Sequence, residues 1–484
     1  MTSVRLRGLL PFLDWFPMSG VQVRADVVAG ITVALVLIPQ SMAYAQLAGM
    51  PAYYGLYAAF LPVLVGALWG SSRQLSTGPV AVVSLLTASA LAPLAAPGSE
   101  QYIGLAILLA FMVGVIQLTL GMLRLGAIVN LLSHPVIIGF TNAAAIIIGL
   151  SQLNKLLGVP MSRSDSFLSD IFGVLLQIRD AHLPTVIMGV SALVMMILLR
   201  RFLPRWPNVL IAVALATLTS YYIGFDRQMQ VAVDAVQDAQ TRTLVSSYLA
   251  QQAGIAKLEA DLSERREAAR LAGKDADPSR RAALEYELEL AELLRDDAMR
   301  ENQSRLQSLR HQRFVAVEGA DGAIALYPEA APMAVQAQDP TRWRISRLEA
   351  DSLRLSGGGE VVGTIPSGLP SLSVPRMSWA DITGLIAVAL VISLVAFMEA
   401  VSIAKAMDAK TRARIDPNQE LIGQGLSNIV GAASQSFPVS GSFSRSAVNL
   451  SAGAVTGLSS VVAGILVLLT LLFLTGLLYH LPQA

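Results

Sequence analysis

The chain has 484 residues, of which 54% are hydrophobic and only 14% charged, and its formal net charge is +1. An ordinary soluble domain carries about 25% charged residues, so the composition excludes that class, and the near-zero charge argues against a nucleic-acid partner. Cysteine is absent, which excludes disulfides and thiol chemistry, and the four histidines lack metal-ligand spacing, so neither a metal nor a cofactor is expected.

Apolar runs of about 20 residues indicate membrane-spanning helices. The apolar segments, in chain order, are residues 27–45, 53–70, 79–92, 101–123, 127–151, 183–199, 208–224, 381–404, 418–434, 440–452 and 454–480. The third and the tenth are too short to cross a hydrocarbon core of about 30 Å as full helices. Each follows a stretch that contains Gly and Pro, which predicts an interrupted helix at both places.

Most of the 35 basic and 34 acidic residues fall between the seventh and eighth spans. The expected organisation is a membrane domain of spans one to seven (1–225), a hydrophilic insert with its loop (226–378), and a membrane domain of spans eight to eleven (379–484). Helical spacing on both sides of a turn predicts a helical hairpin over about 228–312, and short alternating runs predict a small β element over about 313–365. The insert is either a docking arm for a partner or a solvated decoration.

Basic residues in the short loops predict the orientation of the chain. With a cytoplasmic N-terminus, the cytoplasmic side receives Arg5, Arg7, Arg24, Arg73, Arg124, Arg200, Arg201, Arg205, Lys405, Lys410, Arg412 and Arg414. The opposite short loops hold only Lys155, Arg163 and Arg179. This is a positive-inside pattern, so we expect a multi-pass protein of the inner cell membrane whose insert lies outside the cytoplasm.

The two halves of the chain show a weak internal repeat. Asp26 precedes the apolar run that begins at Gly30, and Asp381 precedes a similar run that begins at Gly384. The two short spans also occupy matching places, and seven spans, an odd number, separate the members of each pair, so the second copy would be inverted. Interrupted segments at matching positions of an inverted repeat point to a transporter site near the membrane midplane.

Two charged residues, Glu399 and Arg445, lie inside apolar segments and away from the span ends. A charge at the bilayer centre costs at least about 2.5–3.5 kcal/mol, so such residues usually serve a function and face a cavity. The alternative is a structural ion pair that joins two helices. Glu399 could bind a proton on one side of the membrane and release it on the other; a permanent ion pair with Arg445 would argue against this role.

The surroundings of Arg445 favour anion binding. Gly441, Ser442 and Ser444 are small, so backbone can approach a ligand closely, and this stretch opens a short helix. A helix N-terminus contributes ~0.3–1 kcal/mol toward an anion, up to ~2 when partly buried, and the guanidinium fork can hold two oxygens at once. Capping and close packing are the alternative roles for the serines.

The third span offers a second helix N-terminus at Gly78-Pro79-Val80. Two opposed helix ends and one guanidinium would form a site for a small, dehydrated anion. Gln40 follows Pro39, which could kink the first span, and its amide could donate to the ligand. An interhelical hydrogen bond is the alternative role for Gln40.

Several stretches resemble the sulfate permease (SulP) family. They are Asp26–Ala45, which resembles the opening signature of the family, Pro51–Tyr57, Ser76–Ser84, Gly139–Leu153, Ile365–Pro370 and Gly441–Asn449. The last is similar to proton-coupled sulfate transporters of the family. The resemblance covers nearly all of 20–225 and 360–484.

The resemblance implies an all-α polytopic membrane protein with a seven-plus-seven inverted repeat. Spans one to four and eight to eleven would form a core domain that moves, elevator-like, against a gate domain and holds an anion between spans three and ten. The pocket carried over by position consists of Gln40, Tyr44, Val80, Ser444 and Arg445. Glu399 matches the span-eight carboxylate of the family.

The sequence departs from the family pattern in two places. The insert at about 226–360 is foreign to most members, and the chain stops at Ala484, where a twelfth span would begin. The fold is therefore expected to be incomplete at the C-terminus, without spans twelve to fourteen and without the cytoplasmic STAS domain.

The expected function is secondary active transport of a small inorganic anion, with sulfate as the first choice. An enzyme is not expected, because no nucleophile–base or metal constellation is visible in the sequence. Proton coupling through Glu399 is expected, with bicarbonate or a dicarboxylate as alternative substrates. The alternative function is a membrane anchor or sensor that does not transport and uses its insert to recruit a partner. Expected partners are the anion, the lipid bilayer, a second copy in a homodimer and a periplasmic partner for the insert.

Overall fold

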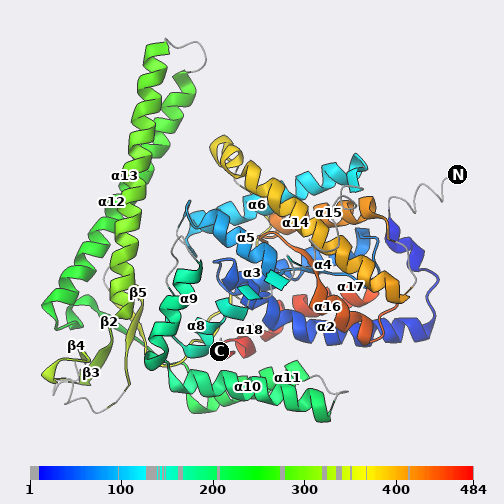
Figure 1. Cartoon of the computed structure of the whole chain (residues 1–484), viewed down its shortest axis with the longest axis horizontal. Coiled ribbons are helices and arrows are strands. Elements are labelled where there is room, and N and C mark those ends of the chain that lie inside the picture. Colours follow the sequence, from blue (N-terminus) through cyan, green and yellow to red (C-terminus); the bar gives the residue numbers. More distant parts are fainter. Residues whose placement is uncertain are drawn as a thin grey trace. The chain divides into compact units, whose positions relative to one another are not determined.

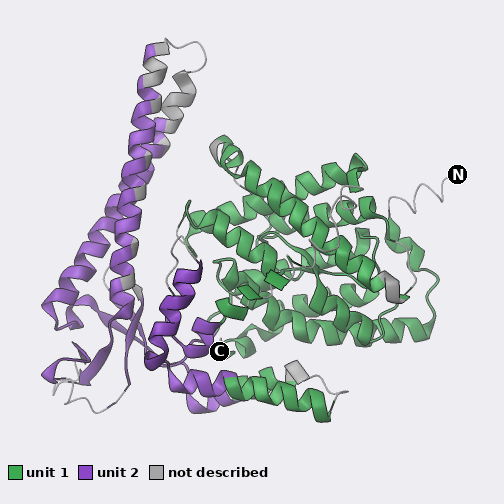
Figure 2. Cartoon of the chain, viewed as in Figure 1, with its two compact units in different colours: residues 1–152, 190–218, 362–483 green, residues 153–189, 219–361, 484 purple. Residues whose placement is uncertain are grey.

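The computed structural model describes residues 10–95, 97–126, 139, 142–143, 146–147, 149–161, 167–203, 208–272, 278–318, 324–333, 339, 341–348, 352–366, 368–375, 377–411 and 415–482. The chain forms two compact units (Figure 2): unit 1 comprises 1–152, 190–218 and 362–483, and unit 2 comprises 153–189, 219–361 and 484. The described residues are mostly helical, with small sheets. Most of the expected fifth span, 127–151, lies outside the described residues.

Helices of unit 1 occupy the segments that the sequence predicts as membrane spans (Figure 1). They are α2 (Gly20–Leu47), α3 (Tyr53–Ala58), α4 (Leu61–Trp69), α5 (Ala81–Leu91), α6 (Glu100–Met122), α14 (Trp379–Thr411), α15 (Pro417–Ala433), α16 (Phe443–Ser451), α17 (Leu458–Leu469) and α18 (Thr475–Leu478). Helices α10 (Leu183–Phe202) and α11 (Asn208–Ile223) have residues in both units. The expected third and tenth spans are short, because α5 has 11 residues and α16 has 9.

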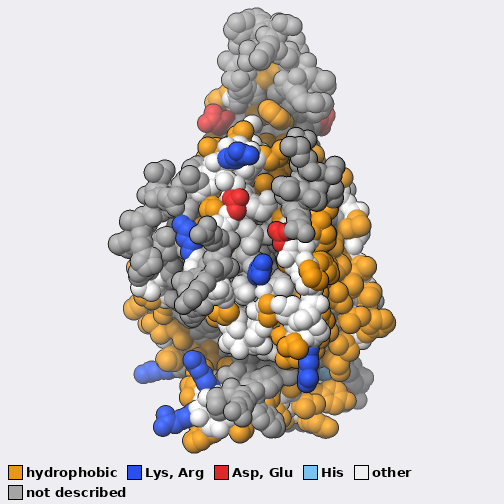
Figure 3. Space-filling view, turned by 90° about the vertical axis from the view of Figure 1, so that its right-hand side faces the viewer, with side chains coloured by type: hydrophobic (Ala, Val, Ile, Leu, Met, Phe, Trp, Pro, Cys, Tyr) orange, Lys and Arg blue, Asp and Glu red, His pale blue; other side chains and the backbone are white. Residues whose placement is uncertain are grey.

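Five helical stretches among the described residues are long and apolar enough to cross a membrane. They are Gly20–Leu47, Glu100–Met122, Leu183–Phe202, Asp381–Met407 and Leu458–Leu478. Shorter apolar helices occupy Tyr53–Trp69, Ala81–Leu91 and Ile211–Ile223. Many large apolar side chains of these helices are exposed, and hydrophobic side chains (orange) cover much of the flank in the space-filling view (Figure 3), as a hydrocarbon environment requires.

Glycines bring α15 into backbone contact with its neighbours. A Cβ added at Gly425 would lie 2.5 Å from the backbone nitrogen of Leu118 on α6, and one added at Gly423 would lie 2.7 Å from the Cα of Gly70. The hydrophobic effect does not drive helices together among apolar lipid tails, so close van der Waals packing at small residues supplies the attraction. Helix α15 is therefore held tightly between α6 and the end of α4.

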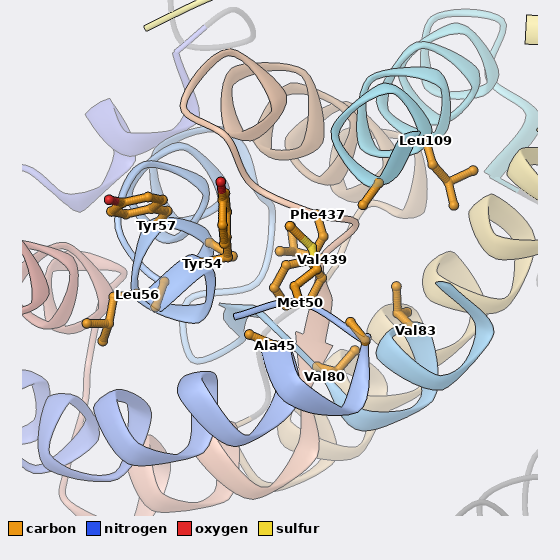
Figure 4. Close-up of a cluster of buried hydrophobic side chains, with 14 of the residues drawn as sticks. Ala45, Met50, Tyr54, Leu56, Tyr57, Val80, Val83, Leu109, Phe437 and Val439 are labelled. Atoms are coloured by element: carbon orange, nitrogen blue, oxygen red, sulfur yellow. The ribbon is translucent and has the colours of Figure 1, made fainter. Parts of the chain in front are cut away.

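A cluster of buried apolar side chains lies between α2, α3, α5 and the segment that precedes α16. Phe437 and Val439 lie close to Met50, with Ala45 and Val80 beside them (Figure 4). These side chains are at most 3% exposed. The cluster anchors the backbone on which α5 and α16 begin.

Two short strands pair in the middle of unit 1. Strand β1 (Ser76–Gly78) runs antiparallel to β7 (Ser440–Ser442), with Thr77 opposite Gly441. The all-α expectation for the membrane part is wrong at this place. Three-residue strands give no readable alternation of polar and apolar residues, and both segments were expected to be the approach to a helix. The pairing joins the segments that lead into α5 and α16.

Unit 2 contains the insert. Its helices are α8 (Leu153–Leu157), α9 (Phe167–Leu176), α12 (Ala239–Ala272) and α13 (Pro278–His311), and its strands are β2 (Gln228–Ala232), β3 (Phe314–Glu318), β4 (Ile324–Pro328), β5 (Arg344–Leu348) and β6 (Ser352–Ser356). Helices α12 and α13 pack along each other, strands β2, β6 and β5 form one sheet in that order, and β3 pairs with β4. Residues 228–232, expected to begin the hairpin, form β2 instead, because Val231 packs into the core of the sheets.

Two arginines bind the insert to the residues that follow α8 and α9 within unit 2. Arg344 donates from Nη1 to the carbonyl of Gly158 (3.0 Å) and from Nη2 to the carbonyl of Asp180 (3.3 Å). Arg313 forms an ion pair with the carboxylate of Asp180 at 2.6 Å. Burial, assisted by the charge of Arg313, lowers the pKa of Arg344, which marks this guanidinium as partly desolvated. The insert is thus fixed to the chain at both places.

Replacing Arg344 with methionine is expected to loosen the backbone at Gly158 and Asp180. The variant leaves the carbonyl of Gly158 without its charged donor, while that of Asp180 keeps only the bond from Arg313 at 3.4 Å. Such hydrogen bonds contribute about 1.5–3 kcal/mol each, so the amides of Gly158 and His182 should exchange hydrogen at least about tenfold faster. Arg342→Met is the matched control, because Arg342 is largely exposed and pairs with Glu329, at 2.8 Å. Equal exchange rates in the two variants would contradict the assignment.

Candidate functional site

Arg445 is fully buried in the first turn of α16. Ser442 is the N-cap of this helix, and its hydroxyl accepts from the backbone nitrogen of Arg445 at 3.4 Å. Serine is favoured at an N-cap because its oxygen satisfies one of the free amides of the first turn. The strand β7 and this cap together direct the Arg445 side chain toward β1.

The guanidinium of Arg445 is only partly satisfied by the protein. Nη1 donates to Gln40 Oε1 (3.1 Å) and to the carbonyl of Pro79 (2.7 Å), and Nε donates to Ser76 Oγ (3.4 Å). Nη2 is buried and has no hydrogen-bond partner among the described residues. A Cβ added at Gly78 would lie 3.1 Å from Nη2, so only glycine leaves space beside this donor. A buried, unused donor of a cation is what an incoming anion requires.

Residues of α2 and α16 complete the site. Gln40 donates from Nε2 to Ser444 Oγ at 3.2 Å, and the hydroxyls of Ser442 and Ser444 lie 3.3 Å apart. Tyr44 lies one turn after Gln40 and interacts with it and with Arg445. Ser444 is exposed, so the site opens at the surface of this chain. The interhelical hydrogen bond weighed for Gln40 is therefore present, and it is made to the site residues themselves.

Two helix N-termini meet at this place. Val80 is the N-cap of α5 and is 3% exposed, while Ser442 is the N-cap of α16. The pairing of β1 with β7 brings the two helix starts together, and the first amides of each helix have no partner within their own helix. The structure thus brings Gln40, Tyr44, Gly78, Val80, Ser442, Ser444 and Arg445 into one place.

Glu399 lies on α14, near enough to Arg445 for an electrostatic interaction. Its Oε2 is buried and has no hydrogen-bond partner, and no ion pair joins it to Arg445 among the described residues. The structural ion pair weighed from the sequence is thus not formed in this state. An unpartnered buried carboxylate oxygen needs a proton, a water or a ligand.

Three contacts of the site were not anticipated. Ser76 and the carbonyl of Pro79 both accept from Arg445, and the Asn449 side chain donates to the carbonyl of Gln74 at 3.1 Å. The polar run before α5 was the signal that could have revealed Ser76. No group of three or more His, Cys, Asp or Glu side chains suited to a metal ion occurs in the part of the chain that the structure describes.

Comparison with known proteins identifies relatives of this chain. At 32% identity, the chloroplastic sulfate transporter 4.1 of Arabidopsis thaliana aligns with 95% of this chain, which covers 49% of that protein. A probable sulfate transporter of Mycobacterium tuberculosis is 30% identical, again over 95% of this chain and 59% of the relative. The chain therefore spans about half the length of these curated relatives.

Solved structures share the fold. The transmembrane domain of the cyanobacterium bicarbonate transporter BicA matches with a TM-score of 0.62 and 17% identity, over 96% of this chain and 86% of that one. The murine Solute Carrier 26 family member A9 anion transporter, in its inward-facing state, matches with a TM-score of 0.66 and 18% identity, over 99% of this chain and 62% of that one. At such identities the likeness shows the fold alone, that of a multi-pass membrane transporter.

The model of the Sulfate permease family matches residues 23–253 and 344–484. The stretch between these two ranges, which includes most of α12 and all of α13, lies outside the match. The matched ranges make up well over half of the chain and contain all of the site residues described above. The chain belongs to the sulfate permease family, a family of anion transporters and not of enzymes.

Proposed function

We propose that this chain forms the anion-binding part of a secondary active transporter for a small inorganic anion, with sulfate as the first choice of substrate. The observation that carries the proposal is the buried Arg445, whose Nη2 is left unpaired beside Gly78 and between two helix N-termini. The names of the relatives, sulfate transporters, favour sulfate. One structural neighbour is a bicarbonate transporter, so bicarbonate remains the alternative, with dicarboxylates next.

The arrangement suits a dehydrated oxyanion. Nη2 of Arg445 would donate to one anion oxygen in a charge-assisted hydrogen bond, and the free amides at the starts of α5 and α16 would donate to others. Each helix end adds ~0.3–1 kcal/mol, up to ~2 where it is partly buried. A small pocket that offers mainly donors favours anions over neutral solutes. Residues of α2, α5, α14 and α16 would carry the anion together in an elevator-like step, because they share unit 1.

Orientation with a cytoplasmic N-terminus is part of the proposal. Arg24, Arg73, Arg124 and Lys405 are all exposed. The face at which α2 begins and α14 ends (Figure 1) is turned to the viewer in Figure 3, and Lys and Arg side chains (blue) are spread over it. Basic loops favour the cytoplasmic side of a membrane, which supports this orientation.

Binding of labelled sulfate to the purified chain in detergent tests the proposal without requiring transport. Specific binding that unlabelled sulfate displaces, and that bicarbonate and succinate displace less well, is the expected result. Displacement by bicarbonate at lower concentration than by sulfate would reassign the substrate, and a lack of binding for all three would overturn the proposal. Binding without uptake into proteoliposomes would favour the anchor or sensor function.

Proton coupling through Glu399 gives a separate prediction. Glu399→Gln removes the group that would carry the proton while it preserves the size of the side chain. Sulfate uptake into proteoliposomes by this variant should no longer respond to an inward pH gradient. Asp381→Asn is the matched control, because Asp381 is another carboxylate of α14 and lies in its first turn. If the Glu399→Gln variant kept the response to the gradient, the proton would be carried elsewhere.

A further inference from the structure

One face of α15 carries three polar side chains at a spacing of four residues, Glu420, Gln424 and Asn428. Residues four apart lie one above the other on a helix, so the three form a ladder along the helix. Each is at most 1% exposed. Burying an amide or a carboxylate is costly unless it is hydrogen-bonded, so the partners of this ladder indicate what it does.

Asn428 pairs with the backbone just before β7. Its Oδ1 accepts from the nitrogen of Val439 at 2.9 Å, and its Nδ2 donates to the carbonyl of the same residue at 3.1 Å. The side-chain amide thus satisfies both backbone groups of Val439, as a neighbouring strand would. Nδ2 also lies 3.1 Å from Oε1 of Gln117, which joins this contact to α6.

Gln424 and Glu420 hold the other strand and its approach. Gln424 donates from Nε2 to Thr77 Oγ1 at 3.1 Å, and Thr77 lies at the centre of β1. Glu420 Oε2 accepts from the backbone nitrogens of Ser71 and Ser72 at 3.0 and 3.2 Å. A single helix therefore holds β1 through Gln424 and the start of β7 through Asn428.

We propose that Gln424 and Asn428 are positioning residues of the anion site, which fix the separation between the N-termini of α5 and α16. The inference rests on the proposed function. Neither residue bonds to Arg445; each acts through the strand that it holds. The strands β1 and β7 pair over only three residues, too few to fix their own position. Helix α15 supplies the rigid element, because Gly423 and Gly425 bring it into backbone contact with its neighbours.

The ladder predicts a role in anion selectivity. Fixed strands give a pocket of fixed size, and a pocket of fixed size distinguishes tetrahedral oxyanions that differ in size, such as sulfate and the larger molybdate. Loss of one rung would let the two helix starts separate. Sulfate binding would then weaken more than molybdate binding, and the preference for sulfate would fall.

Asn428→Leu tests the inference, because leucine has a similar size and cannot bond to Val439. Dissociation constants for sulfate and molybdate are measured on the purified full chain. Sulfate affinity should fall about tenfold, equivalent to ~1.4 kcal/mol, and the sulfate-to-molybdate ratio should fall by a similar factor. Ser427→Ala is the matched control: Ser427 is a buried neighbour on α15 that bonds to the carbonyl of Pro62 and not to either strand. It should leave the ratio unchanged.

A double-mutant cycle covers the case in which Asn428→Leu fails to fold. Gln424→Met and Thr77→Val each remove one side of the hydrogen bond between these two residues, and Gln424→Met also removes the bond to Glu420. The part of the loss in sulfate affinity that comes from the shared bond should make the two effects non-additive. Additive effects would overturn the inference, and so would an unchanged sulfate-to-molybdate ratio in a folded Asn428→Leu chain. In either case the proposed function would stand as long as the wild-type chain bound sulfate. A wild-type chain that bound no sulfate would overturn both.

Discussion

Replacing Arg445 with alanine is expected to reduce sulfate affinity by at least about 30-fold, because removing one partner of a buried charge pair costs about 2–5 kcal/mol. The change removes the unpaired Nη2 that the anion would use. It also leaves Gln40, Ser76 and the carbonyl of Pro79 without the donor that Arg445 supplies. The folded site is therefore less stable even when no anion is bound. The measurement is equilibrium binding of labelled sulfate to purified wild-type and variant chains.

Arg445→Lys separates charge from geometry. Lysine retains the positive charge but presents a point charge in place of a planar fork, so it cannot serve Gln40, Pro79 and an anion together. The sulfate affinity of the Arg445→Lys chain should lie between those of the wild-type chain and the alanine variant. Arg73→Ala removes an exposed arginine and should have no effect. Sulfate affinity close to the wild-type value in the Arg445→Ala chain would refute the site assignment.

The sequence revealed this site through features that local patterns can show. A charge inside an apolar run stands out because of its cost, which directed attention to Arg445 and Glu399. Short apolar runs after Gly and Pro indicated interrupted helices, and α5 and α16 are short. The contact of Gln40 with Arg445 fits the same reasoning, since both lie on apolar segments with few polar neighbours.

What the sequence did not reveal depends on contacts between distant residues. Thr77 and Gln424 are 347 positions apart, and no local pattern pairs them. The polar ladder lies in a run that was interpreted as an ordinary span, because the apolar residues between its polar ones set the class of the run. The strands β1 and β7 are too short to show an alternation of polar and apolar residues. The strand β2 was expected to be helical, since its partner β6 lies more than a hundred residues away and nothing near β2 in the sequence indicates the pairing.

Gly78→Ala is expected to damage the site without removing any of its hydrogen-bonding groups. Gly78 has a φ of +150°, a conformation that residues with a side chain rarely adopt. Its new methyl group would lie 3.1 Å from Arg445 Nη2 and 3.4 Å from Cγ2 of Val63. Relief of this crowding requires either the guanidinium or β1 to shift, and both define the pocket.

The Gly78→Ala chain should therefore bind sulfate at least about fivefold more weakly, since strained backbone positions of this kind cost about 1–3 kcal/mol. Titration calorimetry with purified protein measures the affinity, and a thermal unfolding curve reports how much of the strain reaches the whole fold. Gly104→Ala on α6 is the control, because nothing lies within 4 Å of a Cβ added there. The lack of a side chain beside Nη2 matters for binding only if an anion uses this nitrogen, so a Gly78→Ala chain that bound sulfate as tightly as the wild type would place the anion elsewhere.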